Sequence, residues 1–417
     1  LPVSKVVNTF KVRASYGSLG NQNTSSLYPT YSTIGTGTGS WIIDGTLANI
    51  AWAPSLVSYN LSWEKIRTWN AGVDFGLFNN RLTGSFDYYI RKTDDMVGPS
   101  EKLPVVLGTA VPSSNNTNLK TFGWELELMW KDRLNNGLNY SARFTLADSR
   151  TKITRYSNPS GLIDGFYAGK YVGEIWGYET IGIAQSDQEM AEHIGRLING
   201  GQSNLGQDWK AGDIMYKDLN EDGKIDAGSR TLQDHGDLKR IGNSTPRYNV
   251  GLELAADWKG FDIRMFWQGT LKRDYFQGSY YFWGANGRQG PWFSTALKGH
   301  DDYFRNDEAS PLGTNLNSYY PRPLFNTDKN QQSQTKYLQD ASYLRLKNLQ
   351  IGYSLPHNIV QKMGMQHLRI FASGENLFTI TSLIDFFDPE SIEGGSWGHG
   401  NVYPLSRTFS FGLNVTF

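Results

Sequence analysis

The stretch YKDLNEDGKID at 216–226 places oxygen-bearing residues at alternate positions. Oxygen ligands with this spacing curl around a hard cation such as Ca²⁺, and a glycine at Gly223 allows the sharp turn. The twelfth position of such a loop is Ser229 instead of a bidentate glutamate, so ligation is incomplete unless Asp213 or Asp234 contributes. The alternative is an Asx-rich turn closed by its own backbone hydrogen bonds. The predicted ligands of a structural calcium ion are Asp218, Asn220, Asp222, the carbonyl of Lys224, and Asp226.

Aromatic side chains are concentrated in two long polar segments, 18–62 and 271–338. Such rings can stack on sugar faces or hold peptide side chains, and they can also pack loops against each other or a partner. We predict packing for most of them, because large rings usually bury. The candidates for contact with a ligand or partner are Trp41, Trp52, Tyr280, Tyr281, Trp283 and Trp292.

Strings typical of enzymes occur without the context that they need. Gly394-Gly395-Ser396-Trp397-Gly398 matches a nucleophile elbow, but HGNVYP follows it where a helix is required. Ser62-Trp63-Glu64-Lys65 matches an S-x-x-K motif, yet no K-T-G exists and the string opens a strand. The six histidines include no HExxH pair. We therefore predict no catalytic site.

The composition excludes further classes of protein. Lys+Arg 40 and Asp+Glu 40 cancel, which argues against a nucleic-acid partner that is held through its phosphates. The absence of cysteine excludes disulfides and Cys-ligated metals. No run of about 18 apolar residues exists, so a membrane protein of this sequence would have to be a β-barrel. The start, LPVSKVVNTF, has neither Met nor signal peptide, and we expect that residue 1 is not the start of the gene product.

Period-two alternation of apolar and polar residues recurs along the chain and predicts about ten strands. In the last of them, Phe409, Phe411, Leu413, Val415 and Phe417 share one face of the sheet. The other predicted strands begin near residues 6, 69, 82, 124, 138, 248, 261, 343 and 368. Between Leu346 and Leu349 the apolar phase slips, which predicts a β-bulge.

The connections between these strands alternate between short and long. The segments 78–81, 132–137, 257–260 and 356–366 are short, whereas the segments 18–62, 95–118, 148–246, 271–338 and 381–404 are long. Outer-membrane barrels have short periplasmic turns and long extracellular loops. A soluble sandwich or propeller is the alternative, but its loops would be similar at both ends. We therefore predict an all-β, transmembrane antiparallel barrel.

The barrel prediction assigns a face to individual side chains. Apolar rings should face lipid, because unpaired polar groups are not tolerated in hydrocarbon. The residues expected to face lipid are Trp69, Trp124, Trp130, Trp267, Phe411 and Phe417, and those expected to face the lumen are Asp74, Asp87, Glu125 and Arg143.

Several stretches resemble the SusC/RagA family of TonB-dependent transporters. They are KVRASYGSLGNQ (11–22), WNAGVDFGLFNNRLTGSFDYYIRKTDDM (69–96), YKDLNEDGKID (216–226), YLQDASYLRLKNLQIGYSLP (337–356), LRIFASGENLFTITS (368–382) and YPLSRTFSFGLNVTF (403–417). The resemblance implies that residues 1–417 form the C-terminal portion, about the last ten strands, of a barrel of roughly 22 strands. The plug domain and the N-terminal strands would then lie outside this chain.

The resemblance also implies a function at the bacterial outer membrane. It is TonB-dependent uptake of a glycan or an oligopeptide, with a SusD-like surface lipoprotein over the loops and the TonB complex contacted through the missing N-terminal region. The two alternatives are a barrel enzyme, such as a surface protease, and a barrel for adhesion or binding.

Overall fold

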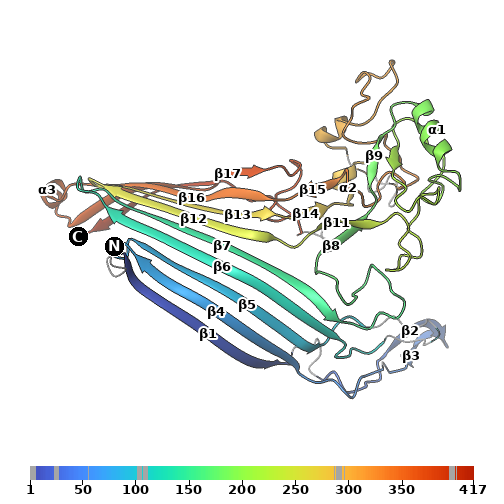
Figure 1. Cartoon of the computed structure of the whole chain (residues 1–417), viewed down its shortest axis with the longest axis horizontal. Coiled ribbons are helices and arrows are strands. Elements are labelled where there is room, and N and C mark those ends of the chain that lie inside the picture. Colours follow the sequence, from blue (N-terminus) through green and yellow to red (C-terminus); the bar gives the residue numbers. More distant parts are fainter. Residues whose placement is uncertain are drawn as a thin grey trace.

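A ten-stranded antiparallel sheet forms the body of the computed structural model, which describes residues 6–22, 28–54, 56–100, 106, 111–285, 287, 294, 296–393, 400 and 402–417 (Figure 1). Each strand pairs with the next one of the sheet along the chain, so the topology is a meander. In sheet order the strands are β1 (Val7–Asn21), β4 (Glu64–Leu77), β5 (Leu82–Met96), β6 (Thr117–Arg133), β7 (Asn139–Arg155), β12 (Arg247–Trp258), β13 (Phe261–Lys272), β16 (Tyr343–Ser354), β17 (His367–Thr381) and β18 (Thr408–Thr416).

All ten strands that the alternation predicted are present, and the short and long connections alternate as expected. The short turns lie at one end of the sheet, where β1 begins and β18 ends, and the long loops lie at the other end (Figure 1). In the turn between β4 and β5, Phe78, Asn79 and Asn80 all have positive φ, at 54°, 58° and 59°. Asparagine tolerates this left-handed conformation well, which suits a tight hairpin turn.

The two faces of the sheet differ in chemistry. The register pairs Val12 with Val73, and Val73 with Phe86, on the apolar face. On the polar face, Arg13 donates hydrogen bonds to Asp74 and Asp87 at distances of 2.8–2.9 Å. The register groups these side chains as the alternation predicted: the pairs Trp69–Ile90 and Leu126–Phe86 lie on the apolar face, and the pair Asp87–Glu125 lies on the polar face. Phe417 lies just beyond the end of β18.

The predicted bulge is confirmed in β16. Leu346 pairs with Trp267 and Asn348 pairs with Phe266, which leaves Lys347 as the additional residue. The same residue interrupts the register between β16 and β17. A bulge re-aims side chains on one strand, and here Arg345 and Lys347 both reach Glu390 in the connection between β17 and β18.

Smaller elements lie within the long loops. They are β2 (Thr36–Ile43), β3 (Thr46–Ala51), β8 (Glu174–Gly177), β9 (Thr180–Ile183), α1 (Asp187–Arg196), β10 (Ile214–Tyr216), β11 (Lys239–Asn243), β14 (Asp274–Phe276), α2 (Tyr280–Trp283), β15 (Leu338–Asp340) and, in the turn after β16, α3 (His357–Val360). The hydroxyl of Ser186 caps α1 by accepting a hydrogen bond from the Glu189 amide at 3.1 Å. Among the residues described, no helix combines the length and apolar character needed to cross a membrane.

Candidate functional site

Three long connections fold together into one loop domain, which we define as the described residues of 156–246, 273–342 and 382–393 (Figure 1). Its hydrophobic core joins all three segments, for example through Tyr216, Phe282 and Ile392, whose side chains are fully buried or nearly so. The aromatic rings of Phe282, Tyr320 and Trp283 contact one another at centroid distances of 5.0–6.3 Å. These three long loops therefore form one packed globular unit.

A buried ionic cluster connects the first loop segment to the second. The carboxylate of Asp213 accepts hydrogen bonds from Arg322 at 2.7 and 2.8 Å and from Asn330 at 2.8 Å, and it pairs with Lys329 at 2.9 Å. The side chains of Asp213 and Lys329 are almost fully buried. Burial raises the pKa of Asp213, but the hydrogen bonds from Arg322, Asn330 and Lys329 outweigh it, so the pKa lies below the usual value. Burial holds the pKa of Lys329 below its usual range.

The third loop segment is attached to the polar face of the sheet by a second set of charges. Arg345 on β16 pairs with Asp388 at 2.8 Å and with Glu390 at 2.7 Å, and Lys347 pairs with Glu390 at 3.0 Å. Tyr275 donates a hydrogen bond from its hydroxyl to the carbonyl of Ile392 at 2.9 Å. Residues 382–393 are thus held against both the sheet and the loop core.

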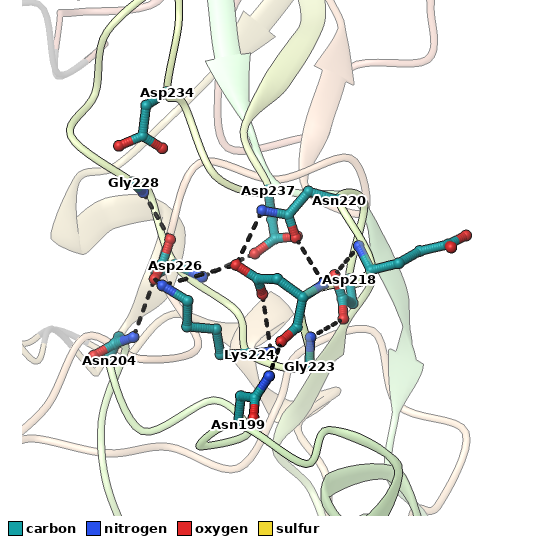
Figure 2. Close-up of polar contacts among 12 residues, drawn as sticks. Asn199, Asn204, Asp218, Asn220, Gly223, Lys224, Asp226, Gly228, Asp234 and Asp237 are labelled. Carbon is teal, nitrogen blue, oxygen red and sulfur yellow. Dashed lines mark hydrogen bonds and ion pairs between the residues drawn. The ribbon is translucent and has the colours of Figure 1, made fainter.

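The predicted calcium loop is closed by hydrogen bonds to its own backbone (Figure 2). Asp218 accepts from the amides of Glu221 and Gly223 at 2.7 and 2.8 Å, and Asn220 accepts from the Asp222 amide at 3.2 Å. These are the contacts of an Asx-rich turn, and they leave lone pairs on the same oxygens.

The cation at this loop is the side chain of Lys224. The amine of Lys224 donates a hydrogen bond to Asp226 at 2.6 Å, and it lies 3.8 Å from the carboxylate of Asp222. The hydrogen bond to Asp226 raises the pKa of Lys224. Across the described part of the chain, no three His, Cys, Asp or Glu side chains converge as a metal site. Calcium ligation through Asp222 and Asp226 therefore requires the amine to move away, and it stays a prediction.

Two neighbouring carboxylates that could supplement the loop have other partners. Asp213 belongs to the ionic cluster with Arg322 and Lys329. Asp234 accepts hydrogen bonds from the hydroxyl and the backbone amide of Ser229 at 2.5 and 2.9 Å, and these two bonds lower the pKa of Asp234. Asp237 accepts from the amides of Leu219 and Asp226 at 2.7 and 2.9 Å and so braces the loop from behind.

The aromatic residues proposed for ligand or partner contact fall into separate places. Trp41 on β2 and Trp52 after β3 are 79% and 53% exposed, and one edge of the Trp52 ring covers Gly37 so closely that a Cβ there would lie 2.6 Å from it. Tyr280 and Tyr281 are half-buried on α2 with ring centroids 4.4 Å apart, and Trp283 is buried in the loop core. Trp292 lies outside the described residues. The β2–β3 hairpin lies apart from α2 (Figure 1), so Trp41 on the hairpin does not share a surface with Tyr280, Tyr281 and Trp283.

The structure describes only one of the two sequence strings that are typical of enzymes. The elbow string and His399 lie outside the described residues. In the S-x-x-K string, the backbone of Ser62 is bound at both its amide and its carbonyl by the side chain of Asn115. The amine of Lys65 lies 3.8 Å from the carboxylate of Asp95. Neither contact is the lysine–serine pair that nucleophilic catalysis would use.

The comparisons with known proteins agree with this architecture. The family model for "TonB dependent receptor-like, beta-barrel" matches residues 3–377. The chain is 29% identical over 439 residues to "TonB-dependent receptor P3" of Formosa agariphila, a match covering 99% of this chain and 40% of that protein. It is 27% identical over 373 residues to "TonB-dependent receptor SusC" of Bacteroides thetaiotaomicron, covering 87% of this chain and 33% of that protein.

A solved structure entitled "Structure of the RagAB peptide transporter" has the same fold, with a TM-score of 0.68 at 22% identity. The match covers 99% of this chain and 41% of that one. The chain thus spans about 40% or less of the length of the relatives that it matches. The resemblance found in the sequence is confirmed, and with it the location in the outer membrane. The chain belongs to the TonB-dependent receptor-like β-barrel family.

Proposed function

We propose that the protein containing this chain imports a nutrient, a glycan or an oligopeptide, across the bacterial outer membrane. The observation that carries the proposal is the combination of a membrane-type sheet with a packed loop domain at the end of the sheet where the long connections lie. A sheet with one apolar and one polar face provides a wall between lipid and a lumen. The loop domain provides a folded surface where a nutrient arrives.

Energy for import would come from the TonB complex. A SusD-like surface lipoprotein would cover the loops and take part in capture. The names of the relatives support both partners, since one is a SusC and another structure is a RagAB transporter. The exposed Trp41 and the half-buried Tyr280 and Tyr281 are candidates for contact with the lipoprotein or the nutrient.

The test is deletion of the gene in its own bacterium, followed by growth on single glycans and oligopeptides as carbon source. We expect loss of growth on one nutrient, restored by the intact gene but not by a version without its TonB-contacting segment. Normal growth together with loss of surface attachment would favour the adhesion alternative. Hydrolysis by the purified protein that disappears on mutation of Ser396 or His399 would favour an enzyme.

We further propose that the loop at 216–229 has a structural role and holds Ca²⁺ when the ion is abundant. Asp218, Asn220, Asp222 and Asp226 provide hard oxygen donors, and loops of this kind vary in affinity with ligand charge and rigidity. The bracing by Asp237 and by Asn199, whose amide binds the Gly223 carbonyl at 2.8 Å, supports a rigid loop.

A further inference from the structure

Four cationic side chains lie close together on the apolar face of the sheet, at the end where the long connections lie. Lys92 on β5 pairs in the register with Lys120 on β6, and Lys120 pairs with Lys152 on β7. Arg150 lies two residues closer to the middle of β7, opposite Phe122. We call the four cations the cationic row. Neighbouring strands are about 5 Å apart, so the row brings three lysines side by side.

The row begins where the apolar side chains of this face end. Alternate residues of a strand share a face, and along β5 these residues are Phe86, Tyr88, Ile90 and then Lys92. Lys92 lies ten residues beyond Leu82, the first residue of β5. At about 3.3 Å per residue and a tilt of about 40°, this corresponds to a height of about 25 Å. That is about the height of the apolar band of an outer-membrane barrel, so the row lies at its upper boundary.

The acidic side chains near the row are bound to other cations. Asp94 on β5 forms an ion pair with Arg67. Asp148 on β7 forms an ion pair with Arg247. Among the residues that the structure describes, the four cations of the row form no ion pair. Like charges that face each other across neighbouring strands destabilise a sheet, so the row requires an anion from outside the described chain.

Two aromatic rings hold cations of the row in place. The amine of Lys92 lies 5.5 Å from the ring centroid of Trp69. The guanidinium of Arg150 lies 4.1 Å from the ring centroid of Tyr171, and the amine of Lys152 lies 5.7 Å from it. Cations over ring faces are attracted by the ring, and they keep their N–H donors available. The aromatic contacts therefore orient the row without neutralising its charge.

The other half of the sheet differs at the same end of its apolar face. There β13, β16 and β17 carry Gly269, Leu344 and Ile380, which pair with one another in the register. Ile380 is 54% exposed, as expected for a side chain that faces lipid. The cations are thus a feature of the sector β5–β7 and not of the whole rim.

We propose that the cationic row binds the phosphate groups of a lipid in the outer leaflet. The long loops of outer-membrane barrels are extracellular, so the row lies at the level of the outer-leaflet headgroups. The adjacent residues Trp69, Ile90 and Phe122 would be covered by acyl chains, while the flexible lysines extend from the apolar face to the headgroup. Basic clusters at this level attract anionic headgroups. An acidic soluble protein fits less well, because the row borders hydrocarbon directly. The proposal does not depend on the import function.

The test measures binding of lipid A to the full-length protein folded in phosphatidylcholine vesicles. Each lysine near an anionic lipid surface contributes about fivefold to binding. We therefore expect binding about a hundredfold weaker when Lys92→Gln, Lys120→Gln and Lys152→Gln are combined. Lipid A without its phosphates should bind weakly to both proteins, and added salt should weaken only the binding of the phosphorylated form.

The matched control removes three positive charges from the polar face near the short turns. Lys131→Gln, Arg133→Gln and Arg264→Gln in combination change the net charge equally. We expect lipid A binding of this control to equal that of the natural protein. An equal loss in the control would show that net charge drives binding, and it would overturn the proposal.

Two further results would overturn the proposal. One is equal binding of lipid A by the natural protein and the triple lysine variant, and the other is equal binding of lipid A with and without phosphates. In phosphatidylcholine alone, the triple lysine variant should melt no lower than the natural protein, because like charges are removed. If the triple variant does not fold, Lys120→Gln decides: about fivefold weaker binding supports the row, and unchanged binding contradicts it.

Discussion

The sheet and the loop domain bury their apolar side chains in different ways. Within the described residues, Ile153, Tyr343 and Leu346 are the buried apolar residues that belong to the ten-stranded sheet. Nearly all the others lie in the loop domain. On the sheet, Phe411 is 85% exposed and Val12 is 68% exposed.

The difference follows from the surroundings of each region. Lipid covers the apolar face of a membrane sheet, so its rings need no protein partner. The loop domain lies in water and must remove its rings from solvent, as any soluble domain does. Apolar side chains of the sheet are therefore covered by lipid, and those of the loop domain are covered by protein. The same kind of substitution should have different consequences in the sheet and in the loop domain.

The largest effect should come from Asp213→Ala, which leaves Lys329 and Arg322 without their shared carboxylate. Removal of one partner from a buried ion pair costs about 3–5 kcal/mol. We expect the loop domain to become sensitive to protease while the barrel retains its heat-modifiable migration on gels. Glu127→Ala is the control: its partner Arg143 is 45% exposed, and an exposed pair contributes about 0–1 kcal/mol. Equal protection of both variants would contradict the role of the buried cluster.

The same cluster predicts a pH dependence. The pKa of Asp213 is lower in the folded protein than in the unfolded chain, where it is about 3.9. A group with a depressed folded pKa contributes its stability above the unfolded value and loses it as the pH falls through the folded one. Protease resistance of the loop domain should therefore hold from neutral pH down to about pH 4 and fall in stronger acid. Loss of resistance near pH 6 would point to another group.

The next effect concerns the sheet. Leu126 lies near the middle of β6 on the apolar face, and its neighbour Glu125 lies on the polar face beside Asp87. Leu126→Arg should cost about 2–4 kcal/mol, the value for arginine on the lipid face near the bilayer midplane. Glu125→Arg should assemble normally, because water or protein covers that face. Assembly can be measured as the yield of protein folded into lipid vesicles. Equal folding yields for Leu126→Arg and Glu125→Arg would contradict the assignment of Leu126 to the lipid face.

The sheet could be predicted from sequence because its signals are local. The alternation of apolar and polar residues predicts each strand of the ten-stranded sheet. The phase slip between Leu346 and Leu349 predicts the bulge, which the structure places at Lys347. The loop domain lacks such a period. Asp213 and Lys329 are separated by more than a hundred positions, and Arg322 lies between two prolines with no nearby carboxylate in the sequence to indicate its partner. The apolar run Ile214–Tyr216 after Asp213 was the one local sign that this acid is buried.

A smaller effect should be found at the predicted calcium loop. Lys224 binds Asp226 and lies near Asp222, so it competes with any metal for these carboxylates. Lys224→Met should therefore tighten calcium binding measured by calorimetry, and Asp218→Ala with Asp222→Ala should abolish it. The absence of heat in both the natural protein and Lys224→Met, with unchanged loop order in the double alanine variant, would favour the Asx-rich turn.

The smallest effect on stability should come from Trp41→Ala, and it separates surface rings from packing rings. Trp41 is 79% exposed on the β2–β3 hairpin, so its removal should change the free energy of unfolding by less than about 0.5 kcal/mol. Trp283→Ala, which empties a site in the loop core, should cost about 3–5 kcal/mol. If Trp41 contacts the lipoprotein, Trp41→Ala should weaken co-purification of the complex although the melting temperature of the loop domain is unchanged. A fall in melting temperature like that of Trp283→Ala would instead mean that the hairpin packs against other parts of the protein.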